Sequence, residues 1–206
     1  MSGKLLFIFI LSASVAMGGC NNSQSEVIAS PSAAVQFSEE IQSALDEERR
    51  LIHAELDDIS YVAQLHAENE TLSVKLTDES IRNLEEIWAQ PDSPLTDTLL
   101  KSKCSMKLKQ FQENHPEFAE IFITDIHGRN VCLTNKTSDY YQADESWWIQ
   151  THATQDPNGL NGPIEYDESA STESISIYFS MLDPSTANKL GVVKAVLKLE
   201  HVAERL

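Results

Sequence analysis

The chain has 206 residues, with 32 aspartates and glutamates against 15 lysines and arginines, and a formal net charge of −17. This balance argues against a nucleic-acid-binding protein, which needs clustered cations to neutralise phosphates, and against docking on anionic lipid through a basic face. The length suits one domain with a real core, or one domain plus a helical extension, and a hydrophobic content of 41% argues against global disorder.

Residues 1–19 have the features of an export signal. Lys4 gives a positive start, residues 5–11 form an unbroken apolar run, and small residues follow up to Gly19-Cys20. The run is too short to span a bilayer comfortably. Cleavage by ordinary signal peptidase is one interpretation. The ending also resembles a bacterial lipobox, and we favour this second interpretation, in which Cys20 becomes the lipidated N-terminus.

Residues 20–36 are predicted to form a flexible tether. They are rich in serine, asparagine and alanine and have no apolar periodicity, so they cannot bury enough surface to offset the entropy of ordering. By resemblance to bacterial lipoproteins, Asn21 directly after the lipidated cysteine favours the outer membrane.

Residues 37–115 are predicted to be helical. Ser38 can cap a first helix that runs past thirty residues, with an apolar stripe at Ile41, Leu45, Ile52, Leu56, Ile59 and Ala63. Ten acids against two bases between residues 38 and 70 leave one face of it solvated. A helix with a single apolar seam packs either on its own domain or against a twin, so a homodimer through this helix is one of two alternatives.

Two further helices follow in this region. Thr77 is a predicted cap for one that ends at Pro91, because threonine accepts hydrogen bonds from the first turn and proline cannot continue a helix. Ser93-Pro94 opens the next one, which closes at His115-Pro116. Its apolar stripe consists of Leu100, Cys104, Leu108 and Phe111.

Residues 116–206 change to a period of two. Strands are predicted at 120–124 and 129–134 around a tight turn, where Gly128 supplies a positive φ, and again at 164–166, 174–181 and 191–199. A short helix is expected at 144–152 and a loop at 159–163. Helices followed by strands with hairpin spacing predict a single domain of the α+β class on an antiparallel sheet.

Four blocks in this half of the chain occur in a characteristic order: Phe118–Val131, Thr137–Trp148, Tyr166–Ala170 and Leu190–Ala195. They resemble the extracellular Cache sensor domains, the PAS-like modules of bacterial receptors. The resemblance implies a PAS-like five-stranded antiparallel sheet (116–206) with a long N-terminal helix and flanking helices (37–115). It also implies a small-molecule pocket between the sheet and the helix-loop segment that covers it. The ligand contacts implied are Tyr141, Trp147 or Trp148, Tyr166 and Asp167.

The residues themselves limit what such a pocket can bind. Adjacent tryptophans on a helix point about 100° apart, so Trp147 and Trp148 cannot both face one surface. Asp167 could bind a ligand ammonium or simply satisfy a turn. Between residues 137 and 188 there are nine acids and no lysine or arginine, which suits an amine through charge pairing and cation–π contact.

A free amino acid or dicarboxylate would need a basic clamp in this pocket. Amino-acid-binding members of the family usually carry a basic residue beside the tryptophan, where this chain has Ser146. A lysine of the preceding helix could supply the cation instead, the candidates being Lys101, Lys103, Lys107 and Lys109.

Cys104 and Cys132 are left once Cys20 is lipidated. They are expected either to form a disulfide, since the exported compartment is oxidising, or to be two buried free thiols. No metal-binding spacing, phosphate loop or nucleophile elbow occurs, so we expect no metal, no cofactor and no enzyme activity.

We therefore expect a lipid-anchored, periplasm-facing sensing or binding protein for a small molecule such as an amine. Because the chain ends just past the last strand without a second transmembrane helix, kinase or methyl-accepting region, it would modulate a separate membrane receptor. The alternative is an envelope interaction lipoprotein that keeps the fold, has its pocket filled by side chains and contacts a partner through the acidic helix.

Overall fold

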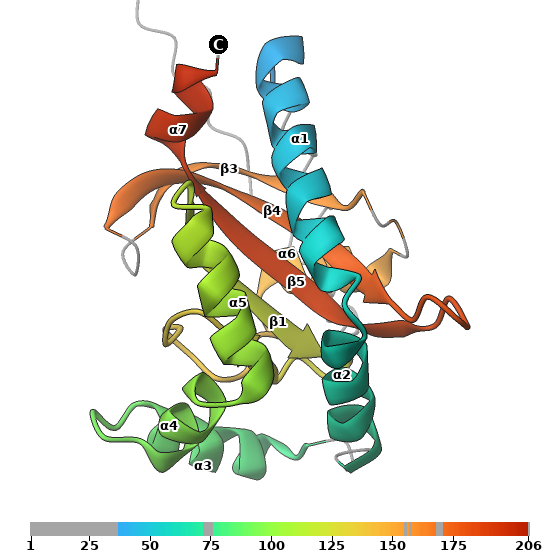
Figure 1. Cartoon of the computed structure of the whole chain (residues 1–206). Helices are drawn as coiled ribbons and strands as arrows, with labels where there is room; N and C mark the ends of the chain where they lie inside the picture. The colour runs from blue at the N-terminus through green and yellow to red at the C-terminus, as the bar shows by residue number, and fades with distance from the viewer. Residues whose placement is uncertain (1–36, 72–75, 155, 157, 168–170, 206) are drawn as a thin grey trace, which may run out of the picture. The chain divides into compact units, whose positions relative to one another are not determined.

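The computed structural model describes residues 37–71, 76–154, 156, 158–167 and 171–205, and it shows one sheet with helices on both faces (Figure 1). The predicted signal segment, the tether and Cys20 lie outside the described residues. Within the described residues, no helix is both long enough and apolar enough to cross a bilayer.

The sheet has five antiparallel strands, as predicted, in the spatial order β2-β1-β5-β4-β3. Gly128, with φ of +86°, makes the tight turn of the β1–β2 hairpin. The predicted loop at 159–163 is wrong for residues 160–163, because they extend β3 across an irregularity in its pairing with β4. The strands are β1 (Phe118–Asp125), β2 (Asn130–Leu133), β3 (Leu160–Asp167), β4 (Thr172–Leu182) and β5 (Lys189–Lys198).

Hydroxyl side chains start most of the helices. The Ser38 hydroxyl accepts a hydrogen bond from the Ile41 backbone N–H, and Thr77 forms a capping box with Ser80. Helix α7 follows β5 directly and has no counterpart among the predicted elements. The helices are α1 (Glu39–Leu56), α2 (Ile59–Thr71), α3 (Asp78–Trp88), α4 (Pro94–Leu100), α5 (Lys103–Asn114), α6 (Ser146–Ala153) and α7 (Leu199–Glu204).

Two predicted helices are each divided in two. The long N-terminal run breaks after Leu56, where the Asp58 carboxylate accepts a hydrogen bond from the Ser60 N–H at 2.8 Å at the start of α2. The third predicted helix breaks after Leu100, because the Ser102 hydroxyl accepts from the Ser105 N–H at 3.2 Å and starts α5. In both places a polar side chain captures a backbone donor within an otherwise continuous apolar stripe.

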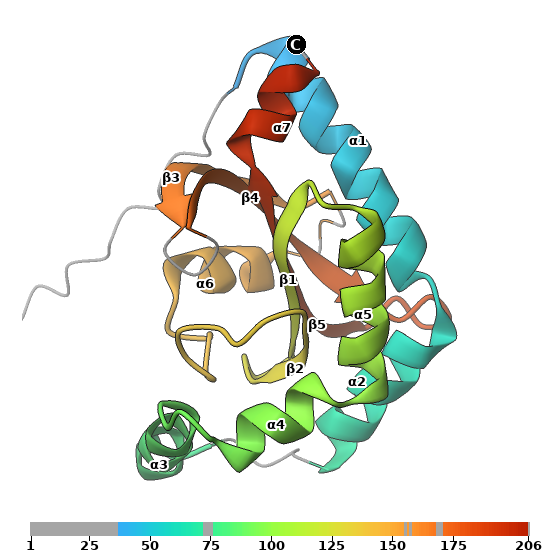
Figure 2. The ribbon, with the colours of Figure 1, turned by 60° about the vertical axis from the view of Figure 1, so that its left-hand side comes forward.

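The two faces of the sheet are covered by different helices (Figure 2). The main core lies between the sheet and helices α1, α2 and α5, and it includes Ile177 and Phe179 of β4 and Val193 of β5. Helix α6 covers the opposite face. The apolar seam of α1, with Leu45 and Ile52 fully buried, is therefore occupied inside its own domain, and a homodimer through this helix remains a prediction.

A disulfide joins Cys104 of α5 to Cys132 of β2, with a Cα–Cα distance of 5.5 Å. Of the two alternatives for these cysteines, the structure contains the bridge. It fastens α5 to the strand at one edge of the sheet.

Breaking this disulfide is expected to destabilise the domain by about 3 kcal/mol, because the bridge closes a loop of 28 residues and restricts the unfolded chain. Replacing Cys104 and Cys132 together by alanine should lower the free energy of unfolding in urea by this amount. A reductant should have the same effect on the native protein and none on the double variant. Equal stabilities of the native and double-variant chains would contradict this prediction.

Candidate ligand-binding site

Helix α6 is fixed to the sheet by polar contacts to the serine-bearing face of β4. The Ser180 hydroxyl donates to the carbonyls of Thr151 at 3.3 Å and Thr154 at 3.2 Å. The Trp148 indole N–H donates to the Thr124 hydroxyl of β1 at 2.8 Å. The alternating strand pattern thus produces two buried faces, of which the one with Ser174, Ser176 and Ser180 is covered rather than solvated.

The two adjacent tryptophans of α6 have different surroundings. Trp148 is only 6% exposed and stacks on the His152 ring at 4.4 Å. Trp147 points the other way and lines a cavity. Of the two tryptophans named as ligand contacts, Trp148 does not line this cavity, because its indole is packed against β1 and its N–H is satisfied by Thr124.

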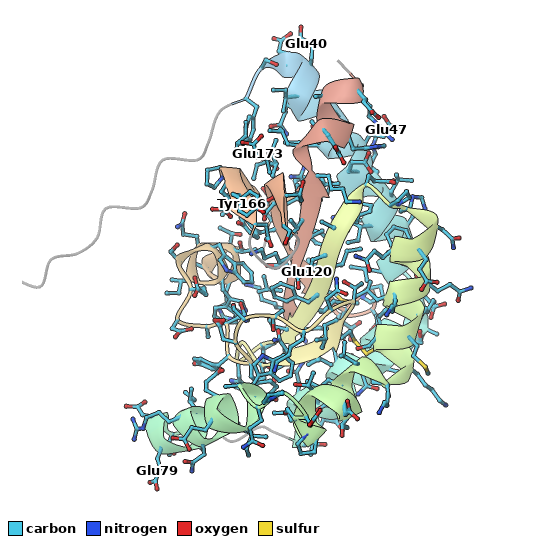
Figure 3. All side chains as sticks on the ribbon, turned by 90° about the vertical axis from the view of Figure 1, so that its left-hand side faces the viewer. Glu40, Glu47, Glu79, Glu120, Tyr166 and Glu173 are labelled. Carbon is cyan, nitrogen blue, oxygen red and sulfur yellow. A yellow bond between two sulfur atoms is a disulfide. The ribbon has the colours of Figure 1, made fainter. Side chains whose placement is uncertain are left out.

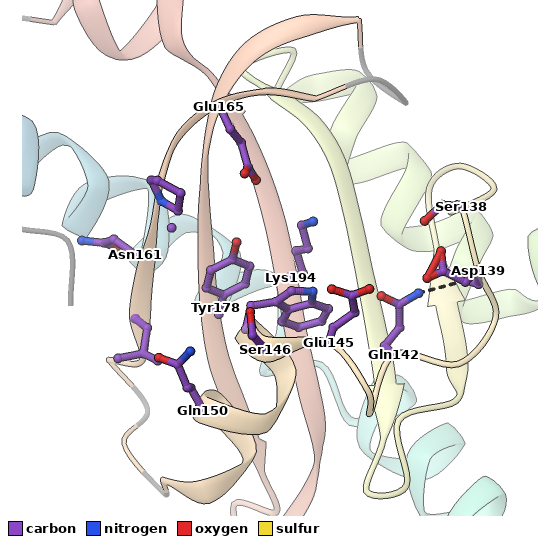
Figure 4. Close-up of a pocket in the computed structure, with 14 residues that line it drawn as sticks. Ser138, Asp139, Gln142, Glu145, Ser146, Gln150, Asn161, Glu165, Tyr178 and Lys194 are labelled. Atoms are coloured by element: carbon purple, nitrogen blue, oxygen red, sulfur yellow. Dashed lines mark hydrogen bonds between the residues drawn. The ribbon is translucent and has the colours of Figure 1, made fainter. Parts of the chain in front are cut away.

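The cavity has a volume of about 480 Å³ and lies between α6 with its preceding loop and strands β3, β4 and β5 (Figure 4). Carboxylates, amides and aromatic rings make up most of its lining. The polar and aromatic side chains are Asp139, Gln142, Glu145, Trp147, Gln150, Asn161, Glu165, Tyr178 and Lys194.

Aromatic rings form one wall of the cavity. Trp147 stacks on Tyr178 with centroids 5.1 Å apart and an interplanar angle of 18°, and it meets Phe122 edge-on at 5.9 Å. The Lys194 ammonium lies 5.5 Å from the Trp147 ring centroid. Trp147 is therefore stacked on Tyr178 and also lies near this chain's own Lys194 ammonium.

The charges of the cavity are mostly negative. Asp139, Glu145 and Glu165 face Lys194, the one cation among its described lining residues (Figure 4). Burial raises the pKa of Glu145, and the neighbouring Asp139 carboxylate raises it further, while Lys194 opposes the rise. Burial also raises the pKa of Tyr178 to about 12, so its hydroxyl stays protonated at neutral pH.

A hydrogen-bond network holds the loop that carries the acidic wall. The Asn130 side-chain amide donates to the Thr137 hydroxyl at 2.7 Å and to the Asp139 carbonyl at 3.0 Å. The Gln142 amide donates to the same carbonyl at 2.9 Å (Figure 4). The Trp88 indole of α3 donates to the Thr137 carbonyl at 2.9 Å. The loop is therefore held in place from two sides.

Tyr166 and Asp167 line a second hollow of about 340 Å³ that adjoins the cavity. The two hollows share Ser138, Gln142, Glu165 and Lys194. Tyr166 is 62% exposed on β3, at the edge of the sheet (Figure 3). These two predicted residues thus lie near the main cavity and outside its wall.

Tyr141, the remaining predicted contact, lines neither hollow. Its backbone N–H donates to the Glu85 carboxylate of α3 at 2.6 Å, and its backbone pairs with Arg129. These contacts place the residue between the hairpin turn and α3, and its role as a ligand contact stays a prediction.

Lys194 is the residue that sequence reasoning missed. The lysines proposed to supply a cation lie elsewhere: Lys101 pairs with Asp97, and Lys107 pairs with Asp58 on the other face of the sheet. Lys194 lies directly opposite Tyr178 in the β4–β5 pairing. The sequence feature that could have identified it is a lysine within an apolar strand. Side chains alternate between the two faces of a strand, so Lys194 lies on the opposite face from the buried Val193 and Ala195.

No protein-family model matches the sequence, and no curated protein is significantly similar to it. Solved structures similar to it include the ligand-binding domain of the Campylobacter jejuni chemoreceptor Tlp3 in complex with L-valine, at 16% identity and a TM-score of 0.42, covering 81% of this chain and 64% of that one. Another is the V. cholerae histidine kinase DctB sensor domain, at 14% identity and a TM-score of 0.38, covering 81% of this chain and 60% of that one. A third is the ligand-binding domain of the Pseudomonas aeruginosa amino acid chemoreceptor PctC in complex with GABA. It has 14% identity and a TM-score of 0.41, and the match covers 81% of this chain and 60% of that one.

This chain thus spans less than two thirds of each of those structures. Each of them is a ligand-binding or sensor domain of a chemoreceptor or a histidine kinase. Identity this low concerns the fold alone, so a ligand for this chain is inferred from the cavity and its lining residues.

The different surroundings of the two tryptophans predict different effects on stability. Trp148→Phe should lower the free energy of unfolding by about 1–2 kcal/mol, because the variant loses a buried hydrogen bond and leaves a small void. Trp147→Phe should lower the free energy of unfolding by less, since the Trp147 ring borders a cavity. Urea unfolding of both variants measures the difference, and a larger loss for Trp147→Phe would contradict this assignment.

Proposed function

We propose that this chain is a small-molecule-sensing domain of the bacterial cell envelope whose ligand carries an ammonium or a similar cationic group. The observation that carries the proposal is the cavity beside α6, whose volume of about 480 Å³ lies in the range of small-molecule sites. A stacked aromatic pair and three carboxylates against one lysine supply its chemistry.

Each part of the cavity suits a different part of such a ligand. An ammonium group gains from charge-assisted hydrogen bonds to Glu145 or Glu165. Lys194 donates only, so it would bind an acceptor group at another point of the same molecule. We therefore propose a small amine that also carries a hydrogen-bond acceptor.

The alternative function, an envelope interaction protein with a filled pocket, requires side chains to occupy this space. An open cavity with Trp147 in its wall favours ligand binding over that alternative. The exposed acids of α1 are compatible with either function, so they do not distinguish the two.

Anchoring of the chain by a lipid on Cys20 belongs to the proposal and rests on the lipobox-like sequence. A lipid-anchored sensing domain can pass on its ligand state through contact with another protein. We propose a separate membrane receptor as the partner that this domain modulates.

The ligand class is tested by thermal unfolding of the chain with small amines, amino acids and dicarboxylates. Amines are expected to raise the melting temperature, by an amount that grows with ligand concentration above Kd, whereas dicarboxylates should have no effect. Glu145→Gln should weaken binding of the best amine by about tenfold, the value of one charge-assisted hydrogen bond. Glu79→Gln, on the exposed face of α3, is the matched control and should bind normally.

Two results would contradict the proposal. Stabilisation by dicarboxylates alone would assign the cavity to anions. No stabilisation by any compound, together with unchanged behaviour of Glu145→Gln, would favour the interaction protein instead.

The lipid anchor is tested by Cys20→Ala. The variant should incorporate no radiolabelled fatty acid and should move from the membrane fraction to the periplasmic extract, because the acyl chains are its only proposed attachment. Ser23→Ala, which lies after the cysteine and leaves the lipobox-like sequence intact, is the control. Unchanged membrane association of Cys20→Ala would contradict lipid anchoring.

A further inference from the structure

Three side chains of metal-ligating type meet on the domain away from the α6 cavity. Glu48 of α1, Glu117 just before β1 and His201 of α7 each place one ligand atom within 4.8 Å of the other two. They come from segments that are far apart in the sequence, so no local sequence motif indicates that they lie together. None of the three lines the α6 cavity or the adjoining hollow.

Part of this cluster is buried without a hydrogen-bond partner. Glu48 is 1% exposed; its Oε1 lies 2.9 Å from the Arg205 guanidinium, while its Oε2 has no hydrogen-bond partner among the described residues. The buried Nε2 of His201 also has none within the described residues. Leaving buried acceptors unsatisfied costs free energy, which a bound positive centre would recover.

The electrostatics of the cluster point the same way. Burial raises the pKa of Glu48, and the nearby Glu117 carboxylate, itself only 7% exposed, raises it further against the opposing effect of Arg205. Two carboxylates so close together repel each other when both are ionised. A cation between them would remove this repulsion.

We propose that Glu48, Glu117 and His201 form a binding site for a divalent transition-metal ion, with Zn²⁺ as the best match. Zinc accepts carboxylate oxygen and imidazole nitrogen together, whereas calcium and magnesium prefer oxygen alone. The three ligands leave a fourth position for water. This proposal does not rest on the function proposed for the α6 cavity.

The surroundings allow the ligands to close around an ion. Bonds of about 2.1 Å in a tetrahedron put ligand atoms about 3.4 Å apart, so the side chains need to move by only about 1 Å. His201 is half-buried at the surface and gives access from solvent. The His115 Nδ1 lies 3.0 Å from Glu117 Oε1, and a contact of this kind orients a ligating carboxylate.

Arg205 does not exclude the ion. Its guanidinium also lies 3.2 Å from the carboxylate of Glu47, which is mostly exposed on α1 beside α7 (Figure 3). It can therefore stay between Glu47 and Glu48 Oε1 while an ion takes Oε2. The ion would join α7, which buries only Val202, to α1 and to the start of β1.

The experiment titrates the full chain with ZnCl₂ in competition with a chromophoric chelator and follows its thermal unfolding. We expect one bound ion per chain and a higher melting temperature with zinc, because the ion binds only the folded arrangement. His201→Gln and Glu48→Gln should each weaken binding by about tenfold or more.

Two matched controls separate this site from general surface binding. Glu40→Gln changes an exposed carboxylate in the first turn of α1, and His66→Gln removes an imidazole that pairs with Asp183 elsewhere. Both should bind zinc normally. If Glu48→Gln does not fold, the half-exposed His201→Gln decides the outcome.

Absence of zinc binding by the native chain would overturn the proposal. So would binding that is unchanged in His201→Gln, or that is lost equally in His66→Gln, since either result would place the ion on other residues.

Discussion

The alternation of side chains along β4 determines how the two faces of the domain are used. Phe179 and its apolar neighbours join the core under α1, α2 and α5, while Tyr178 and small serines face α6. Ser180 is small enough for α6 to approach and accept its hydroxyl hydrogen bonds. Tyr178 is large and stacks on Trp147, at the point where the cavity lies. Serines next to a tyrosine thus give both a fixed helix and an open space.

Local chemistry made much of this fold predictable, and competition between local signals explains the rest. Thr77 as a cap and Gly128 as a turn residue act within a few positions, so the sequence alone identified them. Apolar periodicity continues across Asp58 and Ser102, which hides the breaks that these side chains create by capping new helices. Whether Cys104 and Cys132 form a disulfide depended on which face of β2 meets α5. That is a tertiary property, which the spacing of the cysteines in the sequence does not encode.

The site was predictable to a similar extent. Helical geometry alone required Trp147 and Trp148 to face different surroundings, but which one is core depends on Thr124, a partner on β1. The stretch without lysine or arginine ends at residue 188, whereas Lys194 reaches the cavity through strand pairing with Tyr178. Window-based composition therefore described the acids correctly and missed the single base among the described lining residues. The pairing register of β4 and β5, rather than the composition of either strand, brings Lys194 to the carboxylates of the cavity.

Helix α1 connects the cavity with the acidic cluster at α7. Arg49 donates to the side chain of Asn161, a cavity-lining residue that in turn donates to Gln42. The neighbouring Glu48 belongs to the cluster with His201. A ligand that shifts α1 through Asn161 would therefore also change the position of Glu48. Thermodynamic linkage then requires a cation at Glu48 to change the affinity of the cavity by the same factor, so α1 is the element through which the two sites would communicate.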